Sequence, residues 1–172
     1  MSDHFADDII AFLPNLRRFA LSLCRNANTA DDLVQVTVER AFRARDQFDP
    51  TTRLDAWLFR ILRNAWIDMV RRQTTQGTEI DIDDAPDARV IDGVQTVETS
   101  LMLKSARAAM QSLPDDQRDV MMLICVEELS YKEASAVLGV PVGTVMSRLS
   151  RARIAVAKKL GINSDPARSS GE

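Results

Sequence analysis

Apolar residues recur at every third or fourth position through most of the first 73 residues. This spacing places them on one face of an α-helix, so each such stretch predicts an amphipathic helix. The predicted helices of this part cover 12–23, 29–44 and 54–72, and Asn28 or Thr29 is expected to cap the second of them. Between the last two helices, Pro50 and its turn-forming neighbours predict a loop over 46–55.

A central stretch, residues 74–100, interrupts the helical pattern. It contains Pro86, Gly93 and seven acidic residues against a single arginine. Proline and glycine disfavour a continuous helix, and a segment with this many acidic residues can bury little apolar surface. We therefore expect an extended or partly disordered linker. Two interpretations of its acidity are open: the charges keep the linker soluble, or the linker mimics a nucleic acid and binds in a basic channel of a partner.

Helical periodicity returns over 101–160. Pro114 suits a first helical turn. Ser130 and Glu133 have the spacing of a capping box, and Gly139 is suited to end the short helix that they begin. The expected fold is therefore all α. It consists of two small helical domains, residues 6–73 and 101–162, on either side of a flexible acidic linker.

The formal net charge of −3 conceals an uneven distribution of charge along the chain. Residues 1–73 have 11 Lys and Arg against 10 Asp and Glu, and residues 101–172 have ten against eight. The acidic excess thus lies in the central stretch. Both flanks keep the positive charge that a nucleic-acid partner requires.

Several classes of function are disfavoured by motifs that the sequence lacks. It has no P-loop, GxGxxG or HExxH pattern, and its one histidine is His4, so we expect no enzyme, no metal and no cofactor. Cys24 and Cys125 are each expected to be small core residues without a disulfide. Neither a run of about 18 apolar residues nor a secretory signal is present, and we expect a cytoplasmic location.

The strongest single pattern lies at 130–157, where a short helix, a tight turn and a longer basic helix predict a helix-turn-helix. Its small core is expected to consist of Ala134, Leu138, Val140, Val145 and Leu149. The longer helix has five basic residues and no Asp or Glu between Val145 and Leu160. Charges of one sign repel each other, so this composition favours the binding of an anion.

The first turns of that longer helix are the part that enters the DNA major groove in such motifs. Ser147, Arg148 and Arg151 lie on its expected exposed face, within reach of base edges. The backbone amides near Gly143 and Thr144 stand at the positive end of the helix, where they can bind a phosphate. The alternative interpretation is a basic face that is only solvated, on a structural pair of helices.

Four segments together resemble the extracytoplasmic-function (ECF) sigma factors of bacteria, and the resemblance covers the chain apart from its two tails. The segments are ADDLVQ at 30–35, WLFRILRN at 57–64, SLPDDQR at 112–118 and SYKEASAVLGVPVGTVMSRLSRAR at 130–153. The first departs from the family pattern, because Val36 stands where the family usually has glutamate. The N-terminal half also resembles the general-stress branch of these factors.

The resemblance implies a protein that lends promoter recognition to RNA polymerase, for genes of a stress response, and that an anti-sigma factor holds in check. The contact with the clamp helices of the polymerase β′ subunit is expected from Asp32, Leu33 and Gln35. Recognition and opening of the −10 element, which require a base to leave the stack, are expected from Phe48, Arg53, Arg60, Arg63, Asn64 and Arg71. Recognition of the −35 element is expected from Gly143, Thr144, Ser147, Arg148, Arg151 and Arg153.

Two other functions are open at this stage. A plain DNA-binding regulator would use only the C-terminal module and bind duplex DNA without polymerase, but it leaves 30–35 and 57–64 unexplained. A sigma-like decoy would bind an anti-sigma factor without DNA, and it is expected to lose the basic helix that is intact here. Trp57 is expected in the core, whereas Trp66 lies off the main apolar stripe and either packs inside or faces a partner.

Overall fold

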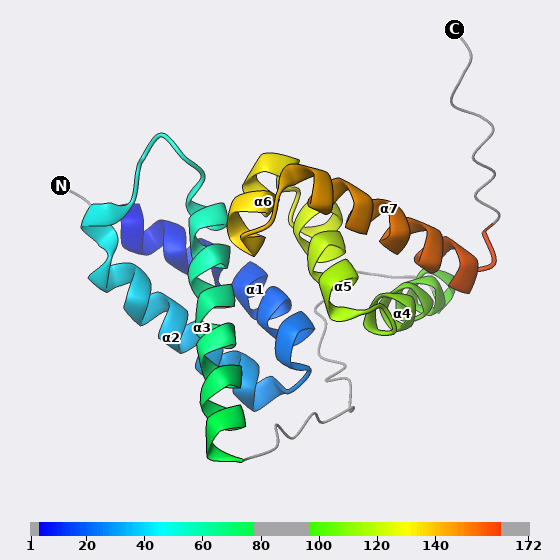
Figure 1. The fold of residues 1–172 in the computed structure, drawn as a ribbon, viewed down its shortest axis with the longest axis horizontal. Helices are drawn as coiled ribbons and strands as arrows, with labels where there is room; N and C mark the ends of the chain where they lie inside the picture. Colours follow the sequence, from blue (N-terminus) through cyan, green and yellow to red (C-terminus); the bar gives the residue numbers. More distant parts are fainter. Residues whose placement is uncertain (1–3, 78–96, 163–172) are drawn as a thin grey trace, which may run out of the picture.

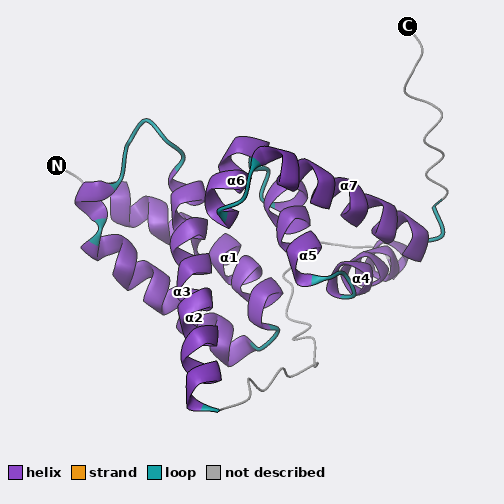
Figure 2. Cartoon of the chain, viewed as in Figure 1, coloured by secondary structure: helices purple, strands orange, loops and turns teal. Residues whose placement is uncertain are grey.

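The structure is a computed structural model that describes residues 4–77 and 97–162. These residues form helices joined by short turns, and no strand occurs among them (Figure 2). The prediction of an all-α fold is confirmed. The expected linker character of 74–100 concerns mainly residues outside the described ranges, although the structure extends the helices on both sides into this stretch.

The first half is a bundle of three helices, α1 (His4–Cys24), α2 (Ala27–Arg43) and α3 (Leu54–Gln76), with a short 3-10 turn, η1 (Arg45–Gln47), between the last two. Its core contains the fully buried side chains of Leu16, Phe19, Leu33, Leu58, Phe59 and Leu62. The rings of Phe19 and Phe59 meet edge to face with their centroids 5.4 Å apart. This geometry is the one that aromatic pairs prefer, and it fixes α1 against α3.

Two helix boundaries in this half differ from the sequence prediction. Helix α1 begins at His4 rather than near residue 12, because Ile9 and Leu16, two turns apart, are both buried on the same face. Helix α2 is capped by Asn26, whose side-chain oxygen accepts a hydrogen bond from the Thr29 amide at 3.0 Å. The expected caps, Asn28 and Thr29, lie inside the helix, so that prediction was wrong.

The second half contains α4 (Val97–Gln111), α5 (Asp115–Met121), a π-helical turn η2 (Met122–Val126), α6 (Tyr131–Leu138) and α7 (Val142–Lys159). The capping box at the start of α6 is confirmed, because Ser130 and Glu133 each accept a hydrogen bond from the other's backbone amide. Gly139 ends α6 in the left-handed region with a φ of 65°. Of the two cysteines, Cys24 is buried as expected, but Cys125 is exposed, which corrects its assignment to the core.

The two halves lie against each other (Figure 1). Helix α6 packs beside α3, and α5 contacts α1. Their buried apolar residues form one continuous cluster that runs from Ile9 in α1 to Ala152 in α7. In this conformation the chain is therefore one packed body, although its sequence pattern divides it into two modules.

Candidate nucleic-acid interface

The helix-turn-helix is built as its pattern predicts. Ala134, Leu138, Val145 and Leu149 are all buried, and Val140 in the turn packs against them. The Ser135 hydroxyl donates a hydrogen bond to the Val140 carbonyl and closes the turn between α6 and α7. These contacts fix the direction of α7 relative to α6, so the exposed face of α7 has a defined orientation.

The exposed face of α7 carries most of the residues that the sequence predicted for −35 DNA. Gly143, Ser147 and Arg151 are exposed, and Thr144 is half-buried. They recur at intervals of three or four residues, so they lie along one side of the helix, opposite the buried Val145 and Leu149. The structure therefore brings these four positions together.

The two remaining arginines of this set stand apart. Arg148 is half-buried and forms an ion pair with Asp116 of α5, Nε to Oδ2 at 3.5 Å. Arg153 is exposed, but two residues of α-helix turn the chain by about 200°, which separates it from Arg151. The structure therefore does not place Arg153 on the same face as Ser147 and Arg151.

Arg60, Asn64 and Arg71 line one face of α3. All three are exposed, and their spacing of four and seven residues superimposes them along the helix axis. Arg63 lies one position off this stripe and is half-buried beside the second half of the chain. Three of the predicted −10 contacts thus form a polar ridge on the solvent side of α3.

The loop before α3 is organised by Asp49. Its carboxylate accepts hydrogen bonds from the Thr51 amide at 2.9 Å and the Thr51 hydroxyl at 2.7 Å. The Thr51 hydroxyl and amide together lower the pKa of the Asp49 carboxyl. The loop therefore has a defined shape before any ligand binds.

Phe48 does not project freely from this loop. Its ring packs 5.1 Å from that of Trp57 and 6.2 Å from that of Phe5, and Phe5 also contacts Phe42. Phe48 is half-buried in this cluster, so it acts here as a support for the loop. Trp57 belongs to the same cluster, and both Trp57 and Trp66 pack partly buried against the core.

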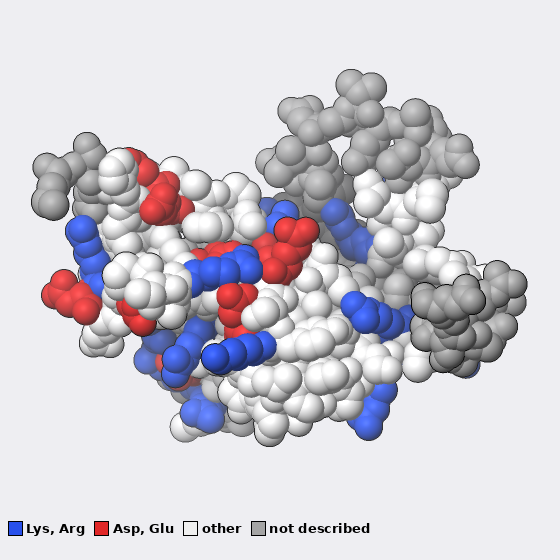
Figure 3. Space-filling view, turned by 90° about the horizontal axis from the view of Figure 1, so that it is seen from above, with Lys and Arg blue, Asp and Glu red and all other residues white. Residues whose placement is uncertain are grey.

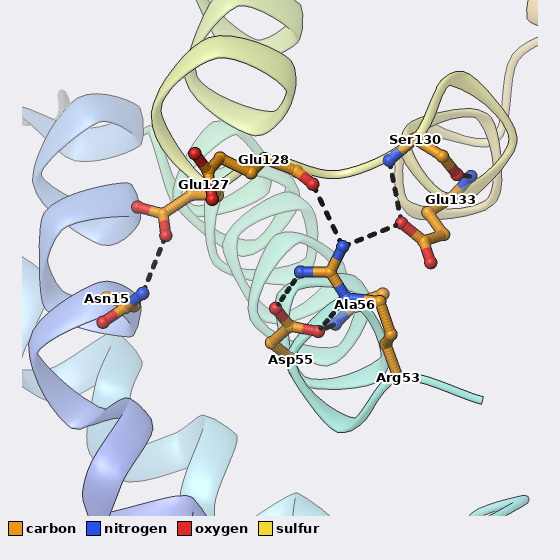
Figure 4. Close-up of polar contacts among 8 residues, drawn as sticks. All are labelled: Asn15, Arg53, Asp55, Ala56, Glu127, Glu128, Ser130 and Glu133. Atoms are coloured by element: carbon orange, nitrogen blue, oxygen red, sulfur yellow. Dashed lines mark hydrogen bonds and ion pairs between the residues drawn. The ribbon is translucent and has the colours of Figure 1, made fainter. Parts of the chain in front are cut away.

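Arg53, at the N-terminal end of α3, is held by several partners (Figure 4). Its guanidinium makes a two-point contact with Asp55, at 3.0 and 2.6 Å. It also donates to the Glu128 carbonyl at 3.0 Å and to Glu133 at 3.2 Å, both in the second half. The hydrogen bonds with Asp55 are the main cause of the raised pKa of Arg53.

The expected polymerase contacts divide into two kinds. Asp32 and Gln35 are exposed, and at a spacing of three residues they share a face of α2. Leu33 is fully buried and belongs to the core. The expectation that the Leu33 side chain contacts a partner is therefore corrected, because it supports α2 from the inside.

Sequence reasoning missed the buried polar residues at the junction of the two halves. Arg118 is 3% exposed and donates hydrogen bonds to the Leu113 carbonyl at 3.2 Å and to the Ser22 carbonyl of α1 at 3.1 Å. Glu127 is 6% exposed, and its carboxylate accepts hydrogen bonds from Asn15 and Arg18 of α1. Their partners in α1 are about a hundred residues away in the chain, so no local pattern could reveal that α1 covers them.

Asp119, in α5, is a third buried charge at this junction. Burial raises the pKa of its carboxyl to about 6, although the positive charges of Arg63 and Arg118 act to lower that pKa. Its Oδ1 atom has no hydrogen-bond partner among the described residues. The ionised carboxylate is thus poorly accommodated at neutral pH.

We expect Asp119→Asn to stabilise the protein at pH 7 by up to about 3 kcal/mol. The pKa of Asp119 is higher in the folded state, about 6, than the value of 3.8 for the unfolded chain. The protonated carboxyl therefore contributes its full stabilisation below pH 3.8, and this stabilisation is lost as the pH rises through about 6. Urea unfolding at pH 5 and pH 7 measures this dependence. An equal substitution at exposed Asp46 serves as the control, and a variant no more stable than the wild type at pH 7 would contradict the prediction.

The described residues contain no group of side chains arranged to hold a metal ion. Among the same residues, no helix is both long and apolar enough to cross a membrane. Figure 3 shows basic and acidic side chains next to one another near the middle of one face.

The comparisons with known proteins agree with this geometry. Residues 9–76 match the family model of sigma-70 region 2, and residues 103–156 match that of sigma-70 region 4. These two modules define a transcription initiation factor of the sigma-70 class, which is not an enzyme. Within that class, the chain belongs to the ECF RNA polymerase sigma factors.

Relatives support the assignment over most of the chain. It is 40% identical over 153 residues to the ECF RNA polymerase sigma factor EcfG of Rhodopseudomonas palustris, covering 89% of this chain and 83% of that one. It is 30% identical to SigW of Bacillus subtilis, covering 92% and 89%. Among solved structures, the sigma factor RpoE of Bartonella quintana, in complex with the anti-sigma factor NepR, superimposes with a TM-score of 0.74 at 34% identity, covering 93% and 98%.

Proposed function

We propose that this ECF sigma factor uses its first half, residues 6–73, to bind core RNA polymerase and the −10 element, and its second half, residues 101–162, to bind the −35 element. The observation that carries the proposal is the exposed side of α7, where Ser147 and Arg151 project from a helix with no acidic residue beyond Val145. A helix of this kind enters the major groove by its first turns. Arg151 is then placed to contact a base edge or a phosphate.

The first half supplies what strand opening requires. Flipping a base out of the stack costs a few kcal/mol, which contacts to the base and the backbone must offset. Arg60, Asn64 and Arg71 form an exposed ridge for the upstream strand. The loop before α3, shaped by Asp49 and supported by Phe48, is the proposed site of the extruded base.

We further propose that the chain acts in the cytoplasm, at stress-response promoters, and that an anti-sigma factor controls it. This part of the proposal is supported by the resemblance to RpoE, whose structure is a complex with an anti-sigma factor. Asp32 and Gln35 are the proposed polymerase contacts on α2. A general-stress role stays a prediction from the N-terminal sequence.

Run-off transcription with core polymerase and promoters from the same genome tests the proposal. Arg151→Ala should reduce −35-dependent transcription by about 5- to 150-fold, the loss expected for one base contact of 1–3 kcal/mol. Arg153→Ala removes the same charge from a different side of α7 and should have a smaller effect. Equal transcription by Arg151→Ala and wild type would refute the assigned face, and failure of the wild type to direct initiation at any promoter would refute the function.

A further inference from the structure

The first turn of α1 contains a phenylalanine to which the proposed function gives no role. Phe5 is half-buried, whereas His4 and Asp7 in the same turn are exposed. An apolar ring at the end of a helix is removed from water only where other side chains cover it. The side chains that cover Phe5 come from α2, from η1, from the loop before α3 and from α3 itself.

Phe5 is the centre of a cluster of four rings. Its centroid lies 5.8 Å from that of Phe42, 6.2 Å from that of Phe48 and 6.3 Å from that of Trp57. All three distances lie in the range over which aromatic pairs attract each other, and the pair with Phe42 is edge to face. We call these four residues the ring cluster. Through it, the start of α1, drawn in dark blue in Figure 1, contacts the end of α2, the loop and the start of α3.

A cation adds to the ring cluster. The guanidinium carbon of Arg45 lies over the Phe5 ring, 5.2 Å from its centroid. A cation in this position is attracted by the quadrupole of the ring. Arg45 is the first residue of η1, and its carbonyl accepts a hydrogen bond from the Phe48 amide at 3.1 Å. Phe5 therefore contacts the residues at both ends of the short turn that leads into the loop.

The loop over 46–53 depends on the ring cluster for its attachment to the helices. Phe48 is half-buried, and every other residue of this loop, all of which the structure describes, is exposed. The hydrogen bonds between Asp49 and Thr51 shape the loop from within, but they join it to no helix. Phe48 is thus the side chain that fixes the loop against the bundle, and the Phe5 ring is one of the surfaces against which it packs.

We propose that Phe5 is a positioning residue for recognition of the −10 element, an inference that rests on the proposed function of the loop as the site of the extruded base. A site reads a base only while its polar groups stay at hydrogen-bonding distance, and a shift of about 1 Å is enough to lose such a contact. Phe5 acts through Phe48 and Arg45 and needs no contact with DNA. The first turn of α1 then contributes to promoter selectivity from outside the −10 residues.

Phe5→Ala tests this role in holoenzyme assembled from the full-length chain and core polymerase. The measured quantity is the discrimination ratio, which is transcription from a promoter with its preferred −10 base divided by transcription from the same promoter with that base changed. The ratio should fall by roughly 10-fold, because only holoenzyme with the loop in place reads the base. A loss of folded protein lowers both transcripts equally and leaves the ratio unchanged, so the ratio separates positioning from stability.

Phe12→Ala is the matched control. Phe12 is also half-buried and packs against the core. It lies seven residues further along α1, about 10 Å along the helix axis. Its loss should lower stability and keep the wild-type discrimination ratio. Phe5→Tyr retains the ring and should restore most of the ratio that Phe5→Ala loses.

Limited digestion of the free protein with trypsin measures the attachment of the loop without transcription. Trypsin cleaves after arginine, and Arg45 and Arg53 flank the loop. Loops that are loosely attached are preferred sites of cleavage. Phe5→Ala should be cleaved at these two arginines about 5-fold faster than Phe12→Ala, the effect of losing one aromatic pair. Cleavage after Arg71, inside α3, reports unfolding of the whole first half and serves as the internal reference.

A wild-type discrimination ratio in Phe5→Ala would overturn the proposal. So would an equal fall of the ratio in Phe12→Ala, or loop cleavage no faster than in that control. A wild type that shows no base preference at any −10 position would instead refute the proposed function of the loop. The rate of trypsin cleavage would then decide by itself whether Phe5 holds the loop in place.

Discussion

Replacing Arg118 with methionine should lower the free energy of unfolding by about 3–5 kcal/mol. The Arg118 side chain is 4% exposed and bonds the Leu113 and Ser22 carbonyls as well as the Asp115 carboxylate. Methionine fills similar space but donates no hydrogen bond, so carbonyls that are shielded from water would lose their donor. Asp115 is exposed and can return to water, so the loss arises mainly from the carbonyls.

Urea-induced unfolding followed by circular dichroism measures this loss. Arg107→Met in α4 is the matched control, because Arg107 is exposed and surface substitutions usually change stability by less than about 0.5 kcal/mol. If both variants unfolded at the same urea concentration, Arg118 would not be the structural support that its contacts indicate.

Leu33→Asp should unfold the first half or cost it more than about 4 kcal/mol, because it places a charge without a partner in a fully buried position. The neighbouring variant Asp32→Ala should change stability by about 0.5 kcal/mol or less, since Asp32 is exposed. Both variants should weaken polymerase binding, but for different reasons: Leu33→Asp by loss of structure, Asp32→Ala by loss of a contact.

Thermal unfolding and a polymerase-binding assay on the same samples separate the two effects. Asp32→Ala combined with Gln35→Ala should bind core enzyme more weakly while keeping the wild-type melting temperature. Wild-type affinity of that double variant would mean that the docking surface lies elsewhere. A stable, fully helical Leu33→Asp protein would contradict the burial of Leu33.

Local sequence signals predicted the elements of the second half well. The capping box of Ser130 and Glu133 and the left-handed Gly139 concern bonds within a few residues, and the structure contains them where they were expected. The same rules failed at α2, where several polar residues in succession were each able to cap and Asn26 was selected. The neighbouring Arg25, in a left-handed conformation after α1, sets where the chain turns.

The sequence predicted which residues belong to the candidate sites better than it predicted which of their side chains are exposed. Motif matching placed Ser147 and Arg151 on a face that is exposed, but it also included Leu33, which is core. It gave Phe48 a direct role, whereas the structure packs that ring against Trp57 and Phe5. A motif records which residues occur together, and burial depends on which helix covers each of them.

The spacing of apolar residues and the local caps by themselves determined that the chain is helical, that it has two modules and that one of them is a basic helix-turn-helix. These features depend on interactions between residues a few positions apart, which periodicity reports directly. Only the tertiary structure decided that the modules close on each other, that Arg53 is occupied and that Glu127 is buried. Glu127 and its partners Arg18 and Asn15 are separated by 109 and 112 residues, and no pattern within a single helix specifies which distant charge will meet it.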